Sequence, residues 1–195
     1  MYNKILLLLV TTFLVCSVQA REIADVQIDE TAVVPGVATP LGLNGAAIRT
    51  KLFFKVYVAA LYVSEKSSNA DVLLANTAGK RMMMHMLYSE VEKEKLVKAW
   101  QEGFEKNLNA SEYAAIKPRL ERFNNMFSTL RKNDVALIDF VPGVGTRVTL
   151  RGEGGHDEEK GVIEGEDFYR ALLSVWIGAA PATDDMKAGL LGLDK

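Results

Sequence analysis

The segment from residue 52 to residue 64 constrains the fold more than any other part of the chain. Its β-branched and aromatic residues predict a strand, and both of its alternating faces are apolar. One face carries Phe53, Tyr57, Ala59 and Leu61, and the other carries Phe54, Val56, Val58 and Tyr62. Since a strand with two apolar faces must be covered on both sides, we expect it at the centre of a sheet.

The surrounding segments predict further strands. Residues 21–40 predict a leading strand and turns, because Pro35, Gly36 and Pro40 are typical turn residues. Residues 80–88 predict a strand whose alternation places Met82, Met84, Met86 and Tyr88 on one face. Residues 135–141 and 146–151 predict a hairpin, followed by a solvated loop and a short strand at residues 161–164.

Several helices are expected between and after these strands. A short helix is predicted at residues 69–77, and Ser89 with Glu92 predicts a capping box that starts a longer one. A second apolar stripe runs from residue 113 to residue 130, where Pro118 is expected to divide the helix. Two more helices are predicted at residues 167–177 and 183–191. This order predicts an α+β protein built on a large antiparallel sheet.

The first twenty residues have the features of a secretory signal. Lys4 precedes an uncharged run from residue 5 to residue 15, and Val18 and Ala20 form a cleavage site of small residues. The alternative is a retained anchor, but the run is shorter than the ~20 residues that span a bilayer. We therefore expect cleavage after Ala20, one domain over residues 21–195, a periplasmic or secreted location, and no stable membrane insertion afterwards. Oligomeric state is not determined by the sequence.

Composition excludes several kinds of site. The net charge is −2 and no basic stripe occurs, so no nucleic-acid partner is expected. The sole cysteine, Cys16, lies in the predicted signal, and His85 and His156 are the only histidines. Without a paired set of ligands, neither a metal site nor a cofactor is expected. No nucleophile elbow of the G-x-S-x-G type is present.

Arg49, just before the apolar strand, is the main candidate for a binding residue. A guanidinium at the edge of an apolar layer needs a carboxylate, several carbonyls or a bound anion. The alternative is a surface arginine whose stem lies on the sheet. Tyr57 is the polar member of one strand face, and a ligand carboxylate could satisfy both side chains. Tyr88, Phe53 and Met84 are the further candidates, although the methionines could equally be ordinary core.

Several motifs together resemble the chalcone isomerase superfamily, in particular its bacterial chalcone isomerase-like members. They are G-x-x-x-R at residues 45–49, KVYVAALYV at 55–63, Tyr-Ser-Glu at 88–90, GVIEGEDFYRALLSVWIG at 161–178, and ATDDMKAGLLG at 182–192. The resemblance covers roughly residues 40–192. It implies an open-faced β-sandwich, in which a large antiparallel sheet has helices packed on one side.

The resemblance also has implications for the site. In the plant isomerases, the arginine at the position of Arg49 acts on the ligand oxygen during ring closure, assisted by a threonine and a tyrosine. Here Tyr57 stands at the threonine position and Tyr88 matches the tyrosine, while another family threonine falls at residues 158–160, which are all charged. The combination of Arg49 and Tyr57 is similar to the pattern of non-catalytic members that bind fatty acids.

We therefore expect a non-catalytic protein that binds a fatty acid or similar amphiphilic carboxylate in an apolar cleft. Its predicted ligand-binding residues are Arg49, Tyr57, Tyr88, Phe53 and Met84. One alternative is an isomerase of unsaturated ketones that uses Arg49 and Tyr88 for catalysis. Haem binding, as in some fungal relatives, is another. The last is an accessory protein for a protein partner, with a sealed cleft and Arg49 held by a carboxylate of its own chain.

Overall fold

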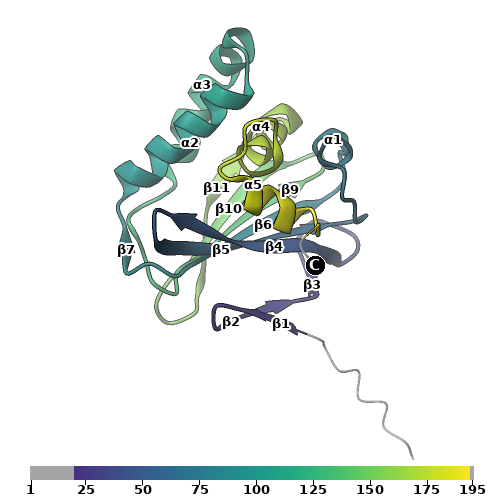
Figure 1. The fold of residues 1–195 in the computed structure, drawn as a ribbon. Helices are drawn as coiled ribbons and strands as arrows, with labels where there is room; N and C mark the ends of the chain where they lie inside the picture. Colours follow the sequence, from purple (N-terminus) through teal and green to yellow (C-terminus); the bar gives the residue numbers. More distant parts are fainter. Residues whose placement is uncertain (1–19, 194–195) are drawn as a thin grey trace, which may run out of the picture.

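The computed structural model describes residues 20–193, and its centre is one curled antiparallel sheet of seven strands (Figure 1). Residues 1–19 of the predicted signal lie outside the described residues. Within the described part of the chain, no helix has the length and apolar character needed to cross a membrane.

The strand order across the sheet is β11-β10-β9-β6-β5-β4-β3. The bounds of these strands are β3 (Thr31–Ala32), β4 (Leu41–Lys51), β5 (Phe54–Val63), β6 (Lys80–Met86), β9 (Val135–Val141), β10 (Gly145–Arg151) and β11 (Asp157–Ile163). Two small sheets accompany it, formed by β1 (Ala20–Ile23) with β2 (Val26–Asp29) and by β7 (Glu90–Val91) with β8 (Leu130–Arg131).

The helices cover one face of the large sheet, and the β1–β2 hairpin lies against the other (Figure 1). The helices are α1 (Ala70–Ala75), α2 (Lys93–Asn107), α3 (Ala110–Asn125), α4 (Glu166–Ile177) and α5 (Asp184–Leu190). The predicted open-faced β-sandwich of the α+β class is therefore confirmed.

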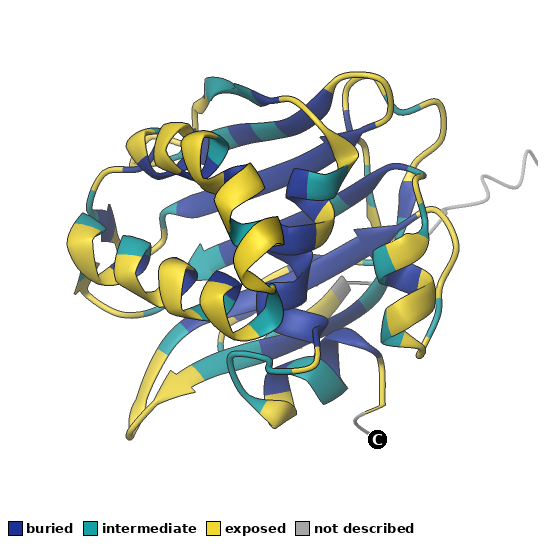
Figure 2. Cartoon of the chain, turned by 90° about the horizontal axis from the view of Figure 1, so that it is seen from above, coloured by how far each residue is buried: buried dark blue, intermediate teal, exposed yellow. Residues whose placement is uncertain are grey.

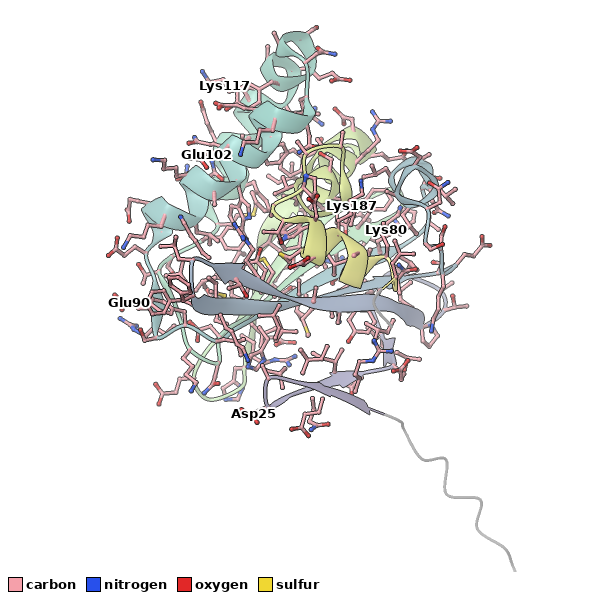
Figure 3. The ribbon with its side chains drawn as sticks, in the orientation of Figure 1. Asp25, Lys80, Glu90, Glu102, Lys117 and Lys187 are labelled. Carbon is pink, nitrogen blue, oxygen red and sulfur yellow. The ribbon has the colours of Figure 1, made fainter. Side chains whose placement is uncertain are left out.

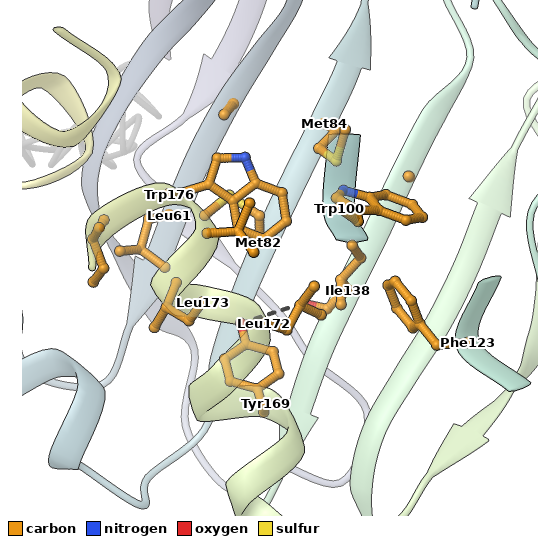
Figure 4. Close-up of a cluster of buried hydrophobic side chains, with 14 of the residues drawn as sticks. Leu61, Met82, Met84, Trp100, Phe123, Ile138, Tyr169, Leu172, Leu173 and Trp176 are labelled. Atoms are coloured by element: carbon orange, nitrogen blue, oxygen red, sulfur yellow. Dashed lines mark hydrogen bonds between the residues drawn. The ribbon is translucent and has the colours of Figure 1, made fainter. Parts of the chain in front are cut away.

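The central strand β5 is buried on both faces, as its composition predicts. Ala59 and Leu61 belong to the core under the helices, whereas Val58 and Ala60 belong to a second core that includes Ile28 of the hairpin. Figure 2, seen from the side of the helices, shows buried strands beneath helices whose outer faces are exposed. Helix α4 is buried on nearly every side, and Figure 4 shows its residues packed against Met82, Met84 and Ile138.

Strand β4 was not expected from the sequence. Gly42, Asn44 and Gly45 are weak strand formers, so residues 41–51 gave no strand signal. A Cβ added at Gly45 would lie 2.7 Å from the carbonyl oxygen of Leu190 and closer still to that of Gly189. Glycine therefore occupies this strand position because the end of α5 approaches the backbone of β4.

Three helix predictions are wrong, one of them because α3 ends at Asn125 and Leu130 lies in strand β8. Ser89 and Glu92 form no capping box, because residues 90–91 are strand β7 and Glu92 makes no side-chain cap. The capping box instead joins Asn109 and Glu112 at the start of α3. Helix α3 also continues through Pro118, whose exposed position leaves the carbonyl freed by the proline open to water.

The last strand is longer than predicted. Residues 157–160 are predicted to lie in a loop, but they form the first half of β11, where residues 157–159 pair with β10 and Lys160 is the extra residue of a bulge. Their charged side chains are mostly exposed because β11 is an edge strand of the large sheet. Charged residues are typical of edges that must not pair with another chain.

Candidate ligand-binding site

A cavity of about 370 Å³ lies between the end of the β4–β5 hairpin and helix α2. Its volume is in the range of small-molecule sites. The apolar part of its wall comes from the sheet, from α2, from α4 and from the segment after α4. These residues are Leu52, Phe54, Val56, Met86, Val91, Leu96, Ala99, Trp100, Val175, Ala180, Pro181 and Ala182.

A β-bulge shapes the sheet side of this cavity. Arg49 pairs with Tyr57 and Thr50 pairs with Lys55, so Val56 is the extra residue of β5. Strict alternation would place Val56 and Phe54 on the face opposite Tyr57, yet all three line the cavity. The bulge bends the strand, so that the residues of β5 nearest the turn face the helices. The carbonyl of Val56 then accepts from the backbone N–H groups of residues 87 and 88.

The structure brings Arg49 and Tyr57 together. They are directly opposite in the antiparallel register, and both line the cavity. The half-buried guanidinium donates from Nη1 to the carbonyl oxygen of Thr50 at 2.6 Å. Among residues 20–193, none of the ion pairs includes Arg49. Its remaining N–H donors are therefore available to an anion.

Tyr57 also has a protein partner that the sequence did not indicate. The indole Nε1 of Trp176, on α4, donates to the phenol oxygen at 3.0 Å. Burial raises the pKa of Tyr57, while the hydrogen bond from Trp176 and the charge of Arg49 oppose that rise. The phenol is thus protonated at neutral pH, and its O–H donates to no acceptor in the hydrogen bonds of the described chain. The sequence does contain a signal for this contact. Trp176 lies on an almost wholly apolar helix, and a buried indole N–H needs an acceptor.

The other three candidate residues have different positions. Tyr88 lines the cavity and is 38% exposed, so it lies where the cavity opens to solvent. Its ring packs edge-on against Phe54 with 5.5 Å between centroids. Phe53 is 95% exposed in the two-residue turn between β4 and β5, and it does not line the cavity. Met84 is fully buried in the core, opposite Ala59, and does not line the cavity either. Met86, two residues later on the same face, does.

Cations outnumber carboxylates around the cavity. Arg49, Lys51, Lys95 and Lys106 contribute positive charge, and Glu90 and Glu102 contribute negative charge. Figure 3 shows Glu90 on β7 and Glu102 on α2. Glu90 is paired with Arg131 at 3.3 Å, and Glu102 lies 4.0 Å from Lys98. This balance favours an anionic ligand. No group of His, Cys, Asp and Glu suitable for a metal ion occurs in the described part of the chain.

Together, the sheet covered by helices on one side and the cavity at the end of its central hairpin define an open-faced β-sandwich protein with an internal ligand-sized site. The chain belongs to the chalcone isomerase-like family, whose model matches residues 20–192. The family resemblance seen in the sequence is therefore confirmed.

One solved structure similar to this chain is the crystal structure of a fatty-acid binding protein of Arabidopsis thaliana. The TM-score is 0.60 at 16% sequence identity, and the match covers 83% of this chain and 96% of the plant protein. At this identity the likeness establishes the shared fold. Curated protein sequences contain no significant match.

Proposed function

We propose that the protein binds a fatty acid or a similar amphiphilic carboxylate in the cavity and does not transform it. The observation that carries this proposal is the guanidinium of Arg49, which has no carboxylate partner in residues 20–193 and stands opposite the protonated phenol of Tyr57. A carboxylate accepts from both groups at once, and hydrogen bonds between ionised partners are among the strongest in proteins.

The hydrocarbon part of such a ligand has apolar walls available. Val56 and Met86 from the sheet face Leu96 and Trp100 from α2 across the cavity. Each buried methylene group contributes about 0.8 kcal/mol to binding. The affinity therefore rises with chain length until the cavity is full, while Arg49 sets the orientation of the head group.

The orientation of Tyr57 suits a fixed hydrogen bond to a ligand carboxylate. Its oxygen already accepts from Trp176, so the phenol is held in one orientation by the core. The plant protein of similar fold is described as a fatty-acid binding protein. We further propose that the protein acts in the periplasm or outside the cell after cleavage at Ala20.

The accessory-protein alternative predicts a sealed cleft and a carboxylate on Arg49, and the described residues show neither. The isomerase alternative has one observation in its favour, since Arg49 and Tyr88 both line the cavity. It predicts conversion of a chalcone or another unsaturated ketone that is lost in Arg49→Gln.

The test compares palmitate with hexadecanol by isothermal titration calorimetry on delipidated protein. A charge-assisted hydrogen bond contributes about 1.5–3 kcal/mol, so Arg49→Gln weakens palmitate binding by roughly 10- to 100-fold. The same variant leaves hexadecanol binding nearly unchanged. Arg122→Gln is the matched control, because Arg122 is an exposed residue of α3 outside the cavity lining. Equal palmitate affinity in wild type and Arg49→Gln would refute the anchor.

A further inference from the structure

The tip of the β4–β5 hairpin is an exposed apolar segment next to the cavity. All five residues from Lys51 to Lys55 are exposed, and the three apolar ones are consecutive. The exposed fraction is 82% for Leu52, 95% for Phe53 and 55% for Phe54. Three adjacent large apolar side chains in water are unfavourable, and such patches mark surfaces that contact a partner.

The backbone of the tip is also unusual. Leu52 has φ of +56°, in the left-handed region that glycine and asparagine adopt most easily. A turn designed only to connect two strands would place one of those residues here. A leucine accepts the strain and projects a large apolar side chain from the end of the hairpin, which is consistent with a use for that side chain.

The charge around the tip points to the chemistry of its partner. Lys51 and Lys55 flank the apolar residues, and neither takes part in the ion pairs of residues 20–193. No Asp or Glu occurs between Glu30 and Glu65, so both strands of the hairpin lack negative charge. Apolar side chains framed by unpaired lysines match an anionic bilayer, whose head groups bind the cations while its acyl region receives the aromatic rings.

The tip and the cavity share residues. Lys51, Leu52 and Phe54 line the cavity as well as forming the tip, and Tyr88 at the cavity opening packs against Phe54. In Figure 1 the turn between β4 and β5 lies at the same end of the molecule as β7 and the start of α2. A surface that receives the tip therefore also lies close to the opening of the cavity.

We propose that residues 51–55 dock the protein reversibly on anionic lipid bilayers, with Phe53 and Leu52 entering the interface and Lys51 and Lys55 binding head groups. Docking brings the cavity opening to the bilayer, where an amphiphile passes between membrane and protein. The docking follows from the tip alone, whereas the exchange of ligand rests on the proposed function.

The test measures flotation of the purified protein with two kinds of vesicle, phosphatidylcholine alone and phosphatidylcholine with 30% phosphatidylglycerol. Wild type binds the anionic vesicles, and 0.5 M NaCl weakens this binding because salt screens the lysines. The double variant Phe53→Ser, Lys55→Gln reduces partitioning at least about ten-fold. Val72→Ser, which removes an exposed apolar residue of α1, leaves it unchanged.

Neither residue of the double variant lines the cavity, so its affinity for dissolved palmitate stays at the wild-type value. This separates the two hypotheses, because loss of docking is read from vesicles and loss of the anchor from Arg49→Gln in solution. Transfer of a fluorescent fatty acid from protein to anionic vesicles slows in the double variant. The docking proposal would be overturned if the wild type did not bind vesicles, or if the wild type and the double variant bound them equally. If the wild type did not bind vesicles but retained another protein, and the double variant did not retain it, the tip would be assigned to a protein partner instead.

Discussion

Replacing Gly45 by alanine tests why glycine stands four residues before the anchor Arg49. The added Cβ would lie 2.7 Å from the carbonyl oxygen of Leu190, about 0.7 Å short of the 3.4 Å at which ordinary contact begins. The clash with Gly189 is more severe, and both obstacles are backbone atoms that cannot rotate away. The end of α5 must therefore move off β4.

The cost follows from two contributions. Overpacking of a close contact costs about 1–3 kcal/mol. The movement also breaks the hydrogen bond from Asn44 Nδ2 to the Leu190 carbonyl, 2.7 Å long, which contributes about 0.5–1.5 kcal/mol. Together we expect Gly45→Ala to lower the free energy of unfolding by about 2–4 kcal/mol, measured by urea denaturation followed by circular dichroism.

Gly42→Ala is the matched control, because it lies on the same strand and also lacks a positive φ. Its added Cβ would meet the Cε atom of Lys66 at 3.1 Å, at the far end of a flexible side chain. We expect a change within about 1 kcal/mol of wild type, since a tolerated Gly→Ala change has a small effect. If the two variants differ by less than about 0.5 kcal/mol, the packing argument for Gly45 is refuted.

Two further predictions concern buried charges. Asp139 accepts from Arg81 through two bonds of 2.6 and 2.7 Å, and its side chain is 2% exposed. Asp139→Ala therefore lowers the free energy of unfolding by about 3–5 kcal/mol, because it leaves the charge of Arg81 buried without a partner. The double variant Arg81→Met, Asp139→Leu recovers most of this loss. A loss below about 1 kcal/mol in Asp139→Ala would contradict the argument. Burial lowers the pKa of Lys80 from 10.5 to about 8, so between these two values the unfolded chain binds more protons and stability rises with pH. Urea titrations from pH 8 to pH 10.5 should show this rise in wild type and not in Lys80→Met; the same rise in both would assign it to other groups.

Local patterns predicted much of the fold because side-chain alternation depends only on neighbouring residues. The two apolar faces of residues 52–64, the methionine strand and the apolar helix at residues 167–177 were all readable in this way. The same reasoning put Tyr57 on the strand face of Ala59 and Leu61, whereas its position opposite Arg49 comes from the pairing of β4 with β5.

Other parts of the fold depend on contacts between distant segments. Gly45 suppresses the strand signal of residues 41–51, and its reason is α5, more than a hundred residues later. The bulge at Val56 exists only in the pairing of β5 with β4, so no alternation pattern could bring Phe54 to the cavity or leave Phe53 outside it.

The sequence by itself determined the class of fold and the central strand, and it singled out Arg49 and Tyr57 as a candidate pair. The pairing of β4 with β5 then placed the two residues opposite each other. Tertiary structure alone decided which side chains surround that pair. Trp176 reaches Tyr57 from a helix 119 residues away, and Met84 is sealed in the core while Met86 faces the cavity. The physical reason is that periodicity assigns a residue to a face, whereas a cavity is made by the packing of several faces on one another.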